Sequence, residues 1–458
     1  MSTNTSSRGG LPPLTPSQFA VVRSTSERLL VGAGAGSGKT STIVQAICHR
    51  VGAAVMDENG QSFSPEVTVS LRQLAAITFT NQAAADLKRK LRAALGSAGL
   101  TEAAREVDSA RVGTIHSFCV DVLREFALQA GSRPTVMVMD DSQSAAIGKA
   151  AAERALLNAV ESRGAEWLEP LRRGRKLKDL APMISELATD SARLDAYAAN
   201  SAELRLHEER LLQLATECAA LRRVELAAQG AHDFDSLLLA TRDLLRDHEE
   251  VRRTLQHRIR LLIVDEFQDV DPVQRDIVML IAGIGTDDPS PSELMIVGDP
   301  KQSIFRFRRA DVTLWNAVAT RFDTEGVGGT SVELTDNFRS RKGILAFVDH
   351  VFGAALDRPV SPLTGRAAFE VNYRALKAVG SDAEGDECVE LRCVPAGTDG
   401  KARGADEVRR LEAADVAERI EALCKGTYKY GDIAILLSGW GAVEEYESAL
   451  QGRGIQVY

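Results

Sequence analysis

The segment from Arg28 to Thr40, "RLLVGAGAGSGKT", constrains the fold of this chain more than any other feature. A short apolar run enters a glycine-rich turn, and the helical pattern "STIVQAICHRV" follows it directly. In such an arrangement the backbone N–H groups of the turn and the helix N-terminus cradle phosphate groups. Lys39 would reach the β and γ phosphates of a nucleotide, and the Thr40 hydroxyl would bind magnesium. The predicted phosphate-binding residues are Ala33, Gly34, Ala35, Gly36, Ser37, Gly38, Lys39 and Thr40.

One position of this phosphate loop departs from the strict pattern. The motif G-x-x-x-x-G-K-T asks for glycine where this chain has Ala33. Alanine fits there if the backbone needs no positive φ at that position. The alternative is a glycine-rich turn that binds nothing, and the flanking strand and helix patterns argue against it.

The rest of the chain predicts an α/β fold with a mainly parallel sheet. Short apolar runs such as "LAAITFT" alternate with longer amphipathic stretches, which is typical of parallel α/β proteins. Between about 140 and 230 the strand patterns vanish and helical spacing dominates, so we expect an inserted all-helical subdomain. Strand patterns return at 261–265 and 294–298, and later in "DECVELRCV" and "DIAILLS". The predicted division is a flexible leader at 1–13, a first core at 14–135 and 233–325, the insertion at 136–232, and a partial second core at 326–458.

Composition bounds the class of protein. A content of 44% hydrophobic and 26% charged residues is ordinary for a soluble chain, and no run is long enough to span a membrane. The polar start also lacks a signal peptide, so we expect a cytoplasmic protein without a membrane partner. Cysteines at 48, 119, 218, 388, 393 and 424 form no CxxC pair, which favours free thiols over zinc or disulfides. The net charge of −9 argues against non-specific coating of nucleic acid, although local basic clusters occur at 88–92, 172–178 and 306–309.

The run "LLIVDEFQD" predicts the catalytic carboxylates. Its apolar strand delivers Asp265 and Glu266 to the carboxyl end of a sheet, the edge where ligands bind in open α/β folds. Asp265 could hold magnesium, and Glu266 would then polarise the water that attacks the γ-phosphate. Alone, such a pair is often only a polar strand end. Together with the phosphate loop it favours nucleotide hydrolysis.

The stretch "VGDPKQSIFRFRRAD" predicts a nucleic-acid contact beside the nucleotide. Gln302 follows another apolar strand and could sense the γ-phosphate through a hydrogen bond. Phe305 and Phe307 could stack on bases while the neighbouring arginines, Arg308 among them, meet the phosphate backbone. The alternative is that both phenylalanines are core residues, which is their usual fate.

Eight ordered segments make the chain resemble a superfamily 1 helicase of the UvrD/Rep group, and within it the helicase part of AddA and RecB helicase-nuclease subunits. They are "LTPSQ", "AGAGSGKT", "AAITFTNQAAADLKRKL", "VGTIHSFC", "DFDSLL", "VDEFQDVDPVQ", "VGDPKQSIFRFRRAD" and "LTDNFRS". The resemblance implies a P-loop RecA-like core and a partial second RecA-like core. It also implies ATP and magnesium as cofactors, and single-stranded DNA and duplex–single-strand junctions as partners.

The resemblance also implies roles for single residues. Gln18 would read the adenine edge, Phe338 would stack on adenine, and Arg339 would reach the γ-phosphate. Contacts with single-stranded DNA are implied for Phe79, Thr80, Asn81, Thr114, His116, Phe305 and Phe307. Two departures stand out. In the segment 305–309, here called the aromatic turn, Phe305 and Phe307 replace the tyrosine and tryptophan of many relatives. Ser41 stands where relatives often carry arginine.

The family's last two core motifs, "SKGLEF"-like and "ALTRA"-like segments, do not occur in this sequence. We therefore expect a fragment or a truncated gene product that lacks one arginine finger. The leading hypothesis is an ATP-driven DNA helicase moving 3′ to 5′ in repair or recombination, joined to a nuclease domain or subunit. The alternative is a nucleotide-gated module that binds DNA or a partner without motor activity. A metabolic kinase fits less well, and an RNA helicase stays open because RNA also stacks on aromatic rings.

Overall fold

The computed structural model describes most of the chain. The described residues are 11–65, 69–172, 176, 179–189, 194, 204–286, 292–322, 329–356, 369–371, 373–379, 389–394, 403–426 and 428–457. Most of the expected leader therefore lies outside the described residues. Leu11 is an exception, because its side chain is buried in the same apolar cluster as Leu14. The ordered core begins before residue 14, earlier than the sequence predicted.

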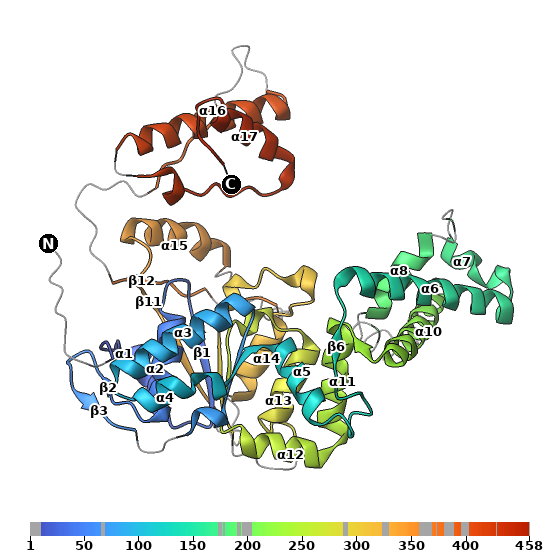
Figure 1. Ribbon diagram of the computed structural model, residues 1–458. Coiled ribbons are helices and arrows are strands. Elements are labelled where there is room, and N and C mark those ends of the chain that lie inside the picture. Colours follow the sequence, from blue (N-terminus) through green and yellow to red (C-terminus); the bar gives the residue numbers. More distant parts are fainter. Residues whose placement is uncertain are drawn as a thin grey trace, which may run out of the picture. The chain divides into compact units, whose positions relative to one another are not determined.

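A six-stranded sheet forms the centre of the larger unit, residues 1–382, and all its paired neighbours run parallel (Figure 1). In spatial order the strands are β10 (Gly329–Leu334), β1 (Arg28–Ala33), β9 (Glu293–Gly298), β8 (Leu261–Val264), β4 (Leu74–Thr78) and β5 (Arg111–Thr114). Parallel strands need crossover connections, and the helices between them supply these. The predicted α/β fold with a parallel sheet is confirmed.

Helices cover both faces of this sheet, because successive strand residues point to opposite sides. In β8, Leu262 and Val264 join one apolar cluster, whereas Leu261 and Ile263 join the other. One face carries α5 (Ile115–Glu125), α11 (Phe234–Asp247), α12 (Glu249–Arg258), α13 (Pro272–Ile281) and α14 (Thr313–Phe322). The other carries α1 (Pro16–Val22), α2 (Lys39–Val51), α3 (Asn81–Ser97) and α4 (Thr101–Arg105). Double coverage explains why the strands read as continuous apolar runs.

Strand β10 corrects one predicted boundary. We expected the first core to end at residue 325, but β10 pairs in parallel with β1 along its whole length, Arg28 with Gly329 through Ala33 with Leu334. The strand therefore belongs to the first sheet. A local pattern shows that a strand forms but not which sheet it joins. Beyond it come β11 (Asp336–Asn337), α15 (Lys342–Leu356) and β12 (Lys377–Ala378).

In the insertion between β6 (Met137–Val138) and β7 (Ala231–His232), the described residues form helices and short connections, and no strand. Its longer helices are α6 (Asp141–Arg163), α8 (Leu180–Thr189) and α10 (Leu206–Gln229), with the short α7 (Glu169–Arg172) beside them. Ala151, Ala155 and Ala159 recur every four residues on α6 and are buried, so the three longer helices approach closely through small side chains. Most of "RRGRKLK" lies outside the described residues. The two strands that bracket the insertion pair with each other in parallel.

Residues 383–458 form a separate compact unit. Its helices α16 (Ala405–Cys424) and α17 (Val443–Gln451) pack through buried Ala417, Ile420 and Leu450. The strands expected in "DECVELRCV" and "DIAILLS" are absent from the described part of this unit. A strand needs a hydrogen-bonded neighbour, and neither segment pairs with one there. Instead, Ile433 and Ile435 pack against the helix cluster.

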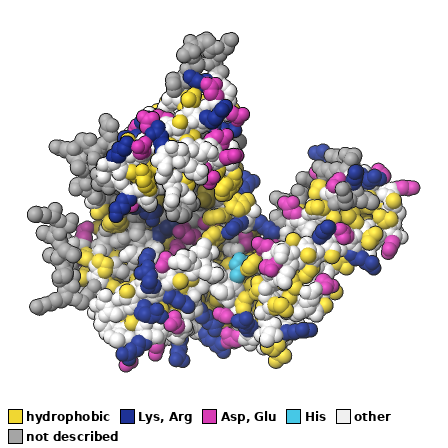
Figure 2. Space-filling model, turned by 45° about the horizontal axis from the view of Figure 1, so that its top comes forward, with side chains coloured by type: hydrophobic (Ala, Val, Ile, Leu, Met, Phe, Trp, Pro, Cys, Tyr) yellow, Lys and Arg dark blue, Asp and Glu magenta, His cyan; other side chains and the backbone are white. Residues whose placement is uncertain are grey.

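The face shown in Figure 2 carries both signs of charge. Its basic side chains are scattered among acidic and uncharged ones rather than gathered in one continuous patch. None of the described helices is both long and apolar enough to cross a membrane. The cysteines that the structure describes, at 48, 119, 218, 393 and 424, are free thiols as predicted, and Cys388 lies outside the described residues.

Candidate nucleotide and nucleic-acid site

The motif residues gather at one edge of the sheet. All six strands are parallel, so their carboxyl ends meet there, and each is followed by a segment singled out in the sequence. The phosphate loop follows β1, "DEFQD" follows β8, and "DPKQ" follows β9. "FTN" follows β4, "IHSF" follows β5, and "NFRS" follows β10 shortly after its end. Nucleotide and nucleic-acid candidates therefore share this edge.

The phosphate loop has the backbone that its glycines predict. Gly36 and Gly38 adopt positive φ values of 74° and 83°, which other residues rarely adopt. A Cβ at Gly34 would lie 2.6 Å from Leu376 Cδ2, so this glycine also lets another segment approach. Ala33, the departure from the motif, is the last residue of β1 and pairs with Leu334. It lies in an extended strand and has no positive φ, so this position does not require glycine.

The loop fits a bound phosphate. The Ser37 hydroxyl is buried and has no hydrogen-bond partner within the described structure. A buried polar atom of this kind is costly unless a ligand satisfies it. The loop leads directly into α2, whose first two residues are Lys39 and Thr40. Free backbone N–H groups in the first turn and the helix dipole favour an anion at this point.

The two carboxylates predicted for catalysis lie against the loop. Lys39 Nζ lies 2.7 Å from Glu266 Oε2. Burial and, secondly, the neighbouring Glu266 raise the pKa of Asp265 to about 6, while Lys39 opposes this rise. A desolvated carboxylate near Lys39, together with the Thr40 hydroxyl, matches the oxygen ligands that magnesium prefers. Glu266 itself has φ 53°, a strained conformation for a non-glycine residue that costs about 1–3 kcal/mol.

A side-chain relay connects Glu266 with the segment after β9. Gln268 Nε2 donates to Glu266 Oε2 at 2.9 Å, and Gln268 Oε1 accepts from the Asp299 backbone N–H at 2.9 Å. Gln302 Nε2 then donates to Asp299 Oδ2 at 2.7 Å. The predicted γ-phosphate sensor Gln302 thus binds Asp299 in this structure, and Lys301 also pairs with Asp299 at 3.1 Å. Gln268 is buried. The sequence reasoning did not predict its contacts with Glu266 and Asp299, because these residues follow two different strands and only the fold brings them together.

The segment after β10 closes over the phosphate loop. Asn337 Nδ2 donates to the Ala35 carbonyl at 2.6 Å, and the Phe338 N–H donates to the Gly36 carbonyl at 2.9 Å. Asn337 is buried, and its Oδ1 accepts from the Arg339 N–H at 2.9 Å. It therefore fixes the backbone of the predicted arginine. The sequence offered "NFRS" as a motif but gave no reason to assign Asn337 a contact.

Gln18 and Phe338 flank the loop where the adenine contacts were predicted. A Cβ at Gly38 would lie 2.9 Å from Gln18 Nε2 and 3.7 Å from the Phe338 ring. Gln18 is oriented at both ends, because its Oε1 accepts from the Thr15 N–H and its Nε2 donates to the Ser37 carbonyl. The Phe338 ring is half exposed and open to stacking.

Three phenylalanines form an aromatic cluster beside the relay: Phe79, Phe305 and Phe307. Ring centroids lie 4.8 Å apart for Phe79 and Phe305, and 5.7 Å apart for Phe305 and Phe307. The Arg308 guanidinium lies 5.6 Å and 5.9 Å from the last two centroids. Phe307 is 77% exposed, so the core alternative fails for this ring. The cluster presents a stacking surface with a cation on it.

The remaining predicted contacts lie at the starts of helices α3 and α5, at the same edge. Thr80 Oγ1 accepts from the Ala83 N–H at the start of α3, which places Asn81 in the exposed first turn. Thr114 Oγ1 accepts from the Ser117 N–H at the start of α5. His116 packs edge-to-face on Phe234 with 5.0 Å between ring centroids.

Burial lowers the pKa of His116, which favours the neutral form of its ring. Phe234 is a further exposed ring that the sequence reasoning left out. The motif "DFDSLL" contained the signal, since an aromatic residue stands beside the helix start.

Comparison with known proteins agrees with this geometry. Residues 14–323 match the family model described as the UvrD/REP helicase N-terminal domain. The chain is 28% identical over 358 residues to the ATP-dependent DNA helicase UvrD1 of Mycobacterium leprae, covering 76% of this chain and 40% of the relative. It is 29% identical over 334 residues to the ATP-dependent DNA helicase Rep of Escherichia coli, covering 72% and 42%. It is 25% identical over 577 aligned positions to an ATP-dependent helicase/nuclease subunit of Pelotomaculum thermopropionicum, covering 89% and 44%.

The chain spans about two fifths of the length of these relatives. The matched family model covers more than half of the chain, and the matched range includes the phosphate loop, the two carboxylates predicted for catalysis and the aromatic cluster. The resemblance read from the sequence is confirmed: the chain belongs to the UvrD/REP helicase family.

Proposed function

We propose that this chain is the motor portion of a DNA helicase that hydrolyses ATP and moves 3′ to 5′ along single-stranded DNA. Its setting would be DNA repair or recombination, within a larger helicase-nuclease assembly. The observation that carries the proposal is the Gln268 relay, which links the carboxylate of Glu266 with the segment that bears Phe305 and Phe307. Such a link suits a protein that couples nucleotide hydrolysis to a grip on nucleic acid.

The nucleotide half of the proposal rests on the phosphate loop. Lys39 and the loop N–H groups would hold the phosphates, and Gln18 and Phe338 would bind the adenine. Thr40 and Asp265 would hold magnesium, which neutralises charge on the phosphates when bound. Glu266 would accept the proton of the attacking water, and Arg339 would face the γ-phosphate.

The DNA half rests on the aromatic cluster. Bases stack on exposed rings without regard to sequence, and each stacked base contributes about 1–3 kcal/mol. Phe305 and Phe307 would stack on bases, and Arg308 would meet the backbone. Thr80, Asn81, Thr114 and His116 would extend the track along the ends of β4 and β5. A duplex–single-strand junction is the proposed loading point, and a nuclease domain or subunit is the proposed partner.

Polarity is tested by streptavidin displacement. Oligonucleotides of deoxythymidine carry biotin at either the 5′ or the 3′ end, and the chain is added with ATP. Movement from 3′ to 5′ predicts displacement from the 5′ end alone, and displacement from the 3′ end alone would overturn the assigned direction.

The second candidate is a nucleotide-gated binding module. It is favoured by the ion pair between Lys39 and Glu266, because a bound phosphate would compete for Lys39 and so change the site without any hydrolysis. Failure to displace streptavidin from either end, together with ATP-dependent DNA binding, would select this candidate.

A further inference from the structure

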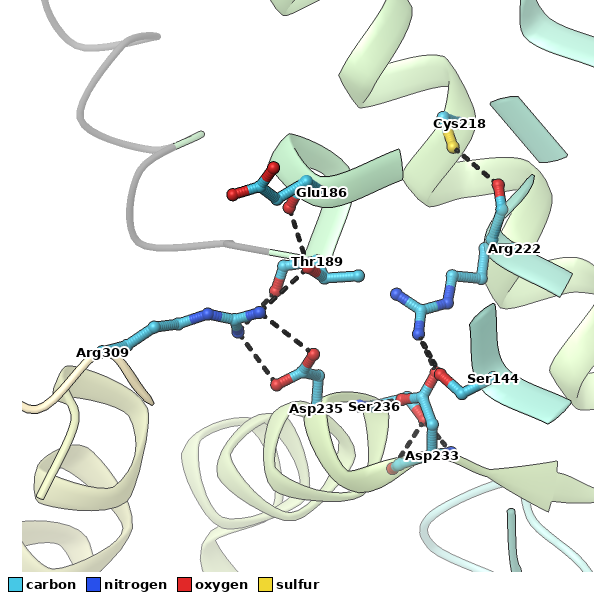
Figure 3. Close-up of polar contacts among 10 residues, drawn as sticks. Ser144, Glu186, Thr189, Cys218, Arg222, Asp233, Asp235, Ser236 and Arg309 are labelled. Carbon is cyan, nitrogen blue, oxygen red and sulfur yellow. Dashed lines mark hydrogen bonds and ion pairs between the residues drawn. The ribbon is translucent and has the colours of Figure 1, made fainter. Parts of the chain in front are cut away.

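The helical insertion meets the core at two polar junctions, drawn in Figure 3. In the first, Arg222 of α10 forms a buried ion pair with Asp233, the N-cap residue of α11, and also donates to the Ser144 hydroxyl. This junction lies beside the paired strands β6 and β7, where the chain enters and leaves the insertion. Because the chain connection and the ion pair both hold this junction, we treat it as the fixed attachment of the insertion to the core.

The second junction depends on one side chain, Arg309. Its Nη1 donates to the Thr189 carbonyl at 2.7 Å and to Asp235 Oδ1 at 2.9 Å. Its Nη2 donates to Thr189 Oγ1 at 2.9 Å and to Asp235 Oδ2 at 3.3 Å. Thr189 ends helix α8 of the insertion, whereas Asp235 lies in the first turn of α11 in the core. The Arg309 guanidinium therefore contacts the insertion and the core at the same time.

The backbone of Arg309 belongs to the aromatic turn. Arg309 ends the short helix Arg306–Arg308, and its N–H donates to the Arg306 carbonyl. Its φ of 68° lies in the left-handed region, where a residue other than glycine is strained. The four side-chain hydrogen bonds hold the residue in that conformation. The positions of Phe307 and Arg308 are thus tied to the junction with the insertion.

Two surface pockets adjoin this junction. Their volumes are about 490 Å³ and about 570 Å³, and Thr189 and Asp235 line both of them. Both pockets are open to solvent, so the junction is not enclosed on every side by packed side chains. A joint that adjoins open space can pivot without breaking a packed interface.

We infer that Arg309 is a positioning residue that couples the DNA-binding aromatic turn to the orientation of the helical insertion. The inference rests on the proposed DNA binding. A base stacked on Phe307 shifts the turn, the shift moves the Arg309 guanidinium, and α8 follows through Thr189. The ion pair is only partly buried, so water limits its strength, and the left-handed strain at Arg309 opposes it; the bridge is therefore poised to rearrange when DNA binds.

Hydrogen–deuterium exchange of the whole chain, with and without a saturating oligonucleotide of deoxythymidine, tests this coupling. In the wild type, DNA should change exchange both in the aromatic turn and in α8. Arg309→Gly removes the bridge while glycine keeps the positive φ of the turn, so DNA affinity should change less than about threefold while the response in α8 is lost. Arg309→Lys should behave like the glycine variant, because an ammonium cannot span the same four acceptors.

Two further variants separate transmission from DNA contact and from folding. Asp235→Asn weakens the same bridge without touching the turn, and it should also diminish the response in α8. Arg308→Ala weakens DNA binding but leaves the bridge intact, so at saturating DNA its α8 response should equal that of the wild type.

Different results would overturn different claims. An unchanged α8 response in Arg309→Gly, or no α8 response in a wild type that binds DNA, contradicts the coupling alone. A wild type that binds no oligonucleotide contradicts the proposed function and the coupling with it.

Discussion

The ammonium group of Lys39 and the carboxylate of Glu266 form an ion pair, although 227 positions separate the two residues in sequence. The cation proposed to bind phosphate and the carboxylate proposed for catalysis thus neutralise each other in this structure. A bound phosphate would compete with Glu266 for Lys39. Nucleotide binding would therefore release Glu266 for catalysis at the moment the substrate arrives.

Replacement of Lys39 by alanine should weaken ATP binding by about 10- to 100-fold, because a charge-assisted contact to the phosphates is lost. Titration with a fluorescent ATP analogue measures this affinity. Lys149→Ala is the matched control, since Lys149 is an exposed lysine on α6 away from the loop. Equal affinities for both variants would show that Lys39 does not bind phosphate.

Gln268→Ala should uncouple DNA from hydrolysis while leaving ATP affinity nearly unchanged. The relay through Asp299 is lost, so the factor by which DNA stimulates ATP turnover should fall about 5- to 100-fold. The measurement is steady-state hydrolysis at saturating ATP with increasing oligonucleotide. Gln274→Ala, in the neighbouring helix α13, should retain full stimulation. The relay account is wrong if Gln268→Ala does so too.

Phe307→Ala should weaken binding of a deoxythymidine oligonucleotide by about 1–3 kcal/mol, because one stacking platform is removed. Fluorescence anisotropy gives the affinity, and Leu128→Ala is the control, since Leu128 is also an exposed apolar residue. Arg308→Ala should instead reduce the slope of log affinity against log salt by about 0.7. A Phe307 variant with wild-type affinity would remove this ring from the binding track.

The lowered pKa of His116 should make the free energy of unfolding depend on pH. Burial lowers its pKa below the ordinary value of 6.5, so the folded ring resists protonation. Above pH 6.5 the fold keeps this contribution in full. As the pH falls below 6.5 the unfolded chain binds the proton first, and the free energy of unfolding decreases.

Urea unfolding between pH 5 and 8 measures this effect. His116→Phe should lose less stability than the wild type over the acid range, whereas His257→Gln, which changes an exposed histidine on α12, should follow the wild type. Parallel curves for the wild type and His116→Phe would contradict the assignment.

The sequence predicted the sheet edge well because each motif is local. A strand, its terminal polar residues and the next helix start lie within about 20 residues, and parallel strands then bring the motifs together. The long-range partners escaped prediction. Asn337 binds Ala35 across 302 positions, and Gln268 bridges two strand ends that no pattern relates. Strand β10 illustrates the same limit, since alternation predicts a strand but not its neighbour.

The central claim is that DNA binding drives ATP hydrolysis at Glu266. The most direct measurement is steady-state ATP turnover by this chain with and without a deoxythymidine oligonucleotide, beside Glu266→Gln, which keeps the shape of the side chain and removes the base. We predict that DNA stimulates turnover by the wild type, and that Glu266→Gln reduces turnover by about 100-fold or more while still binding ATP. Turnover that ignores DNA, or that survives in Glu266→Gln, would contradict the account.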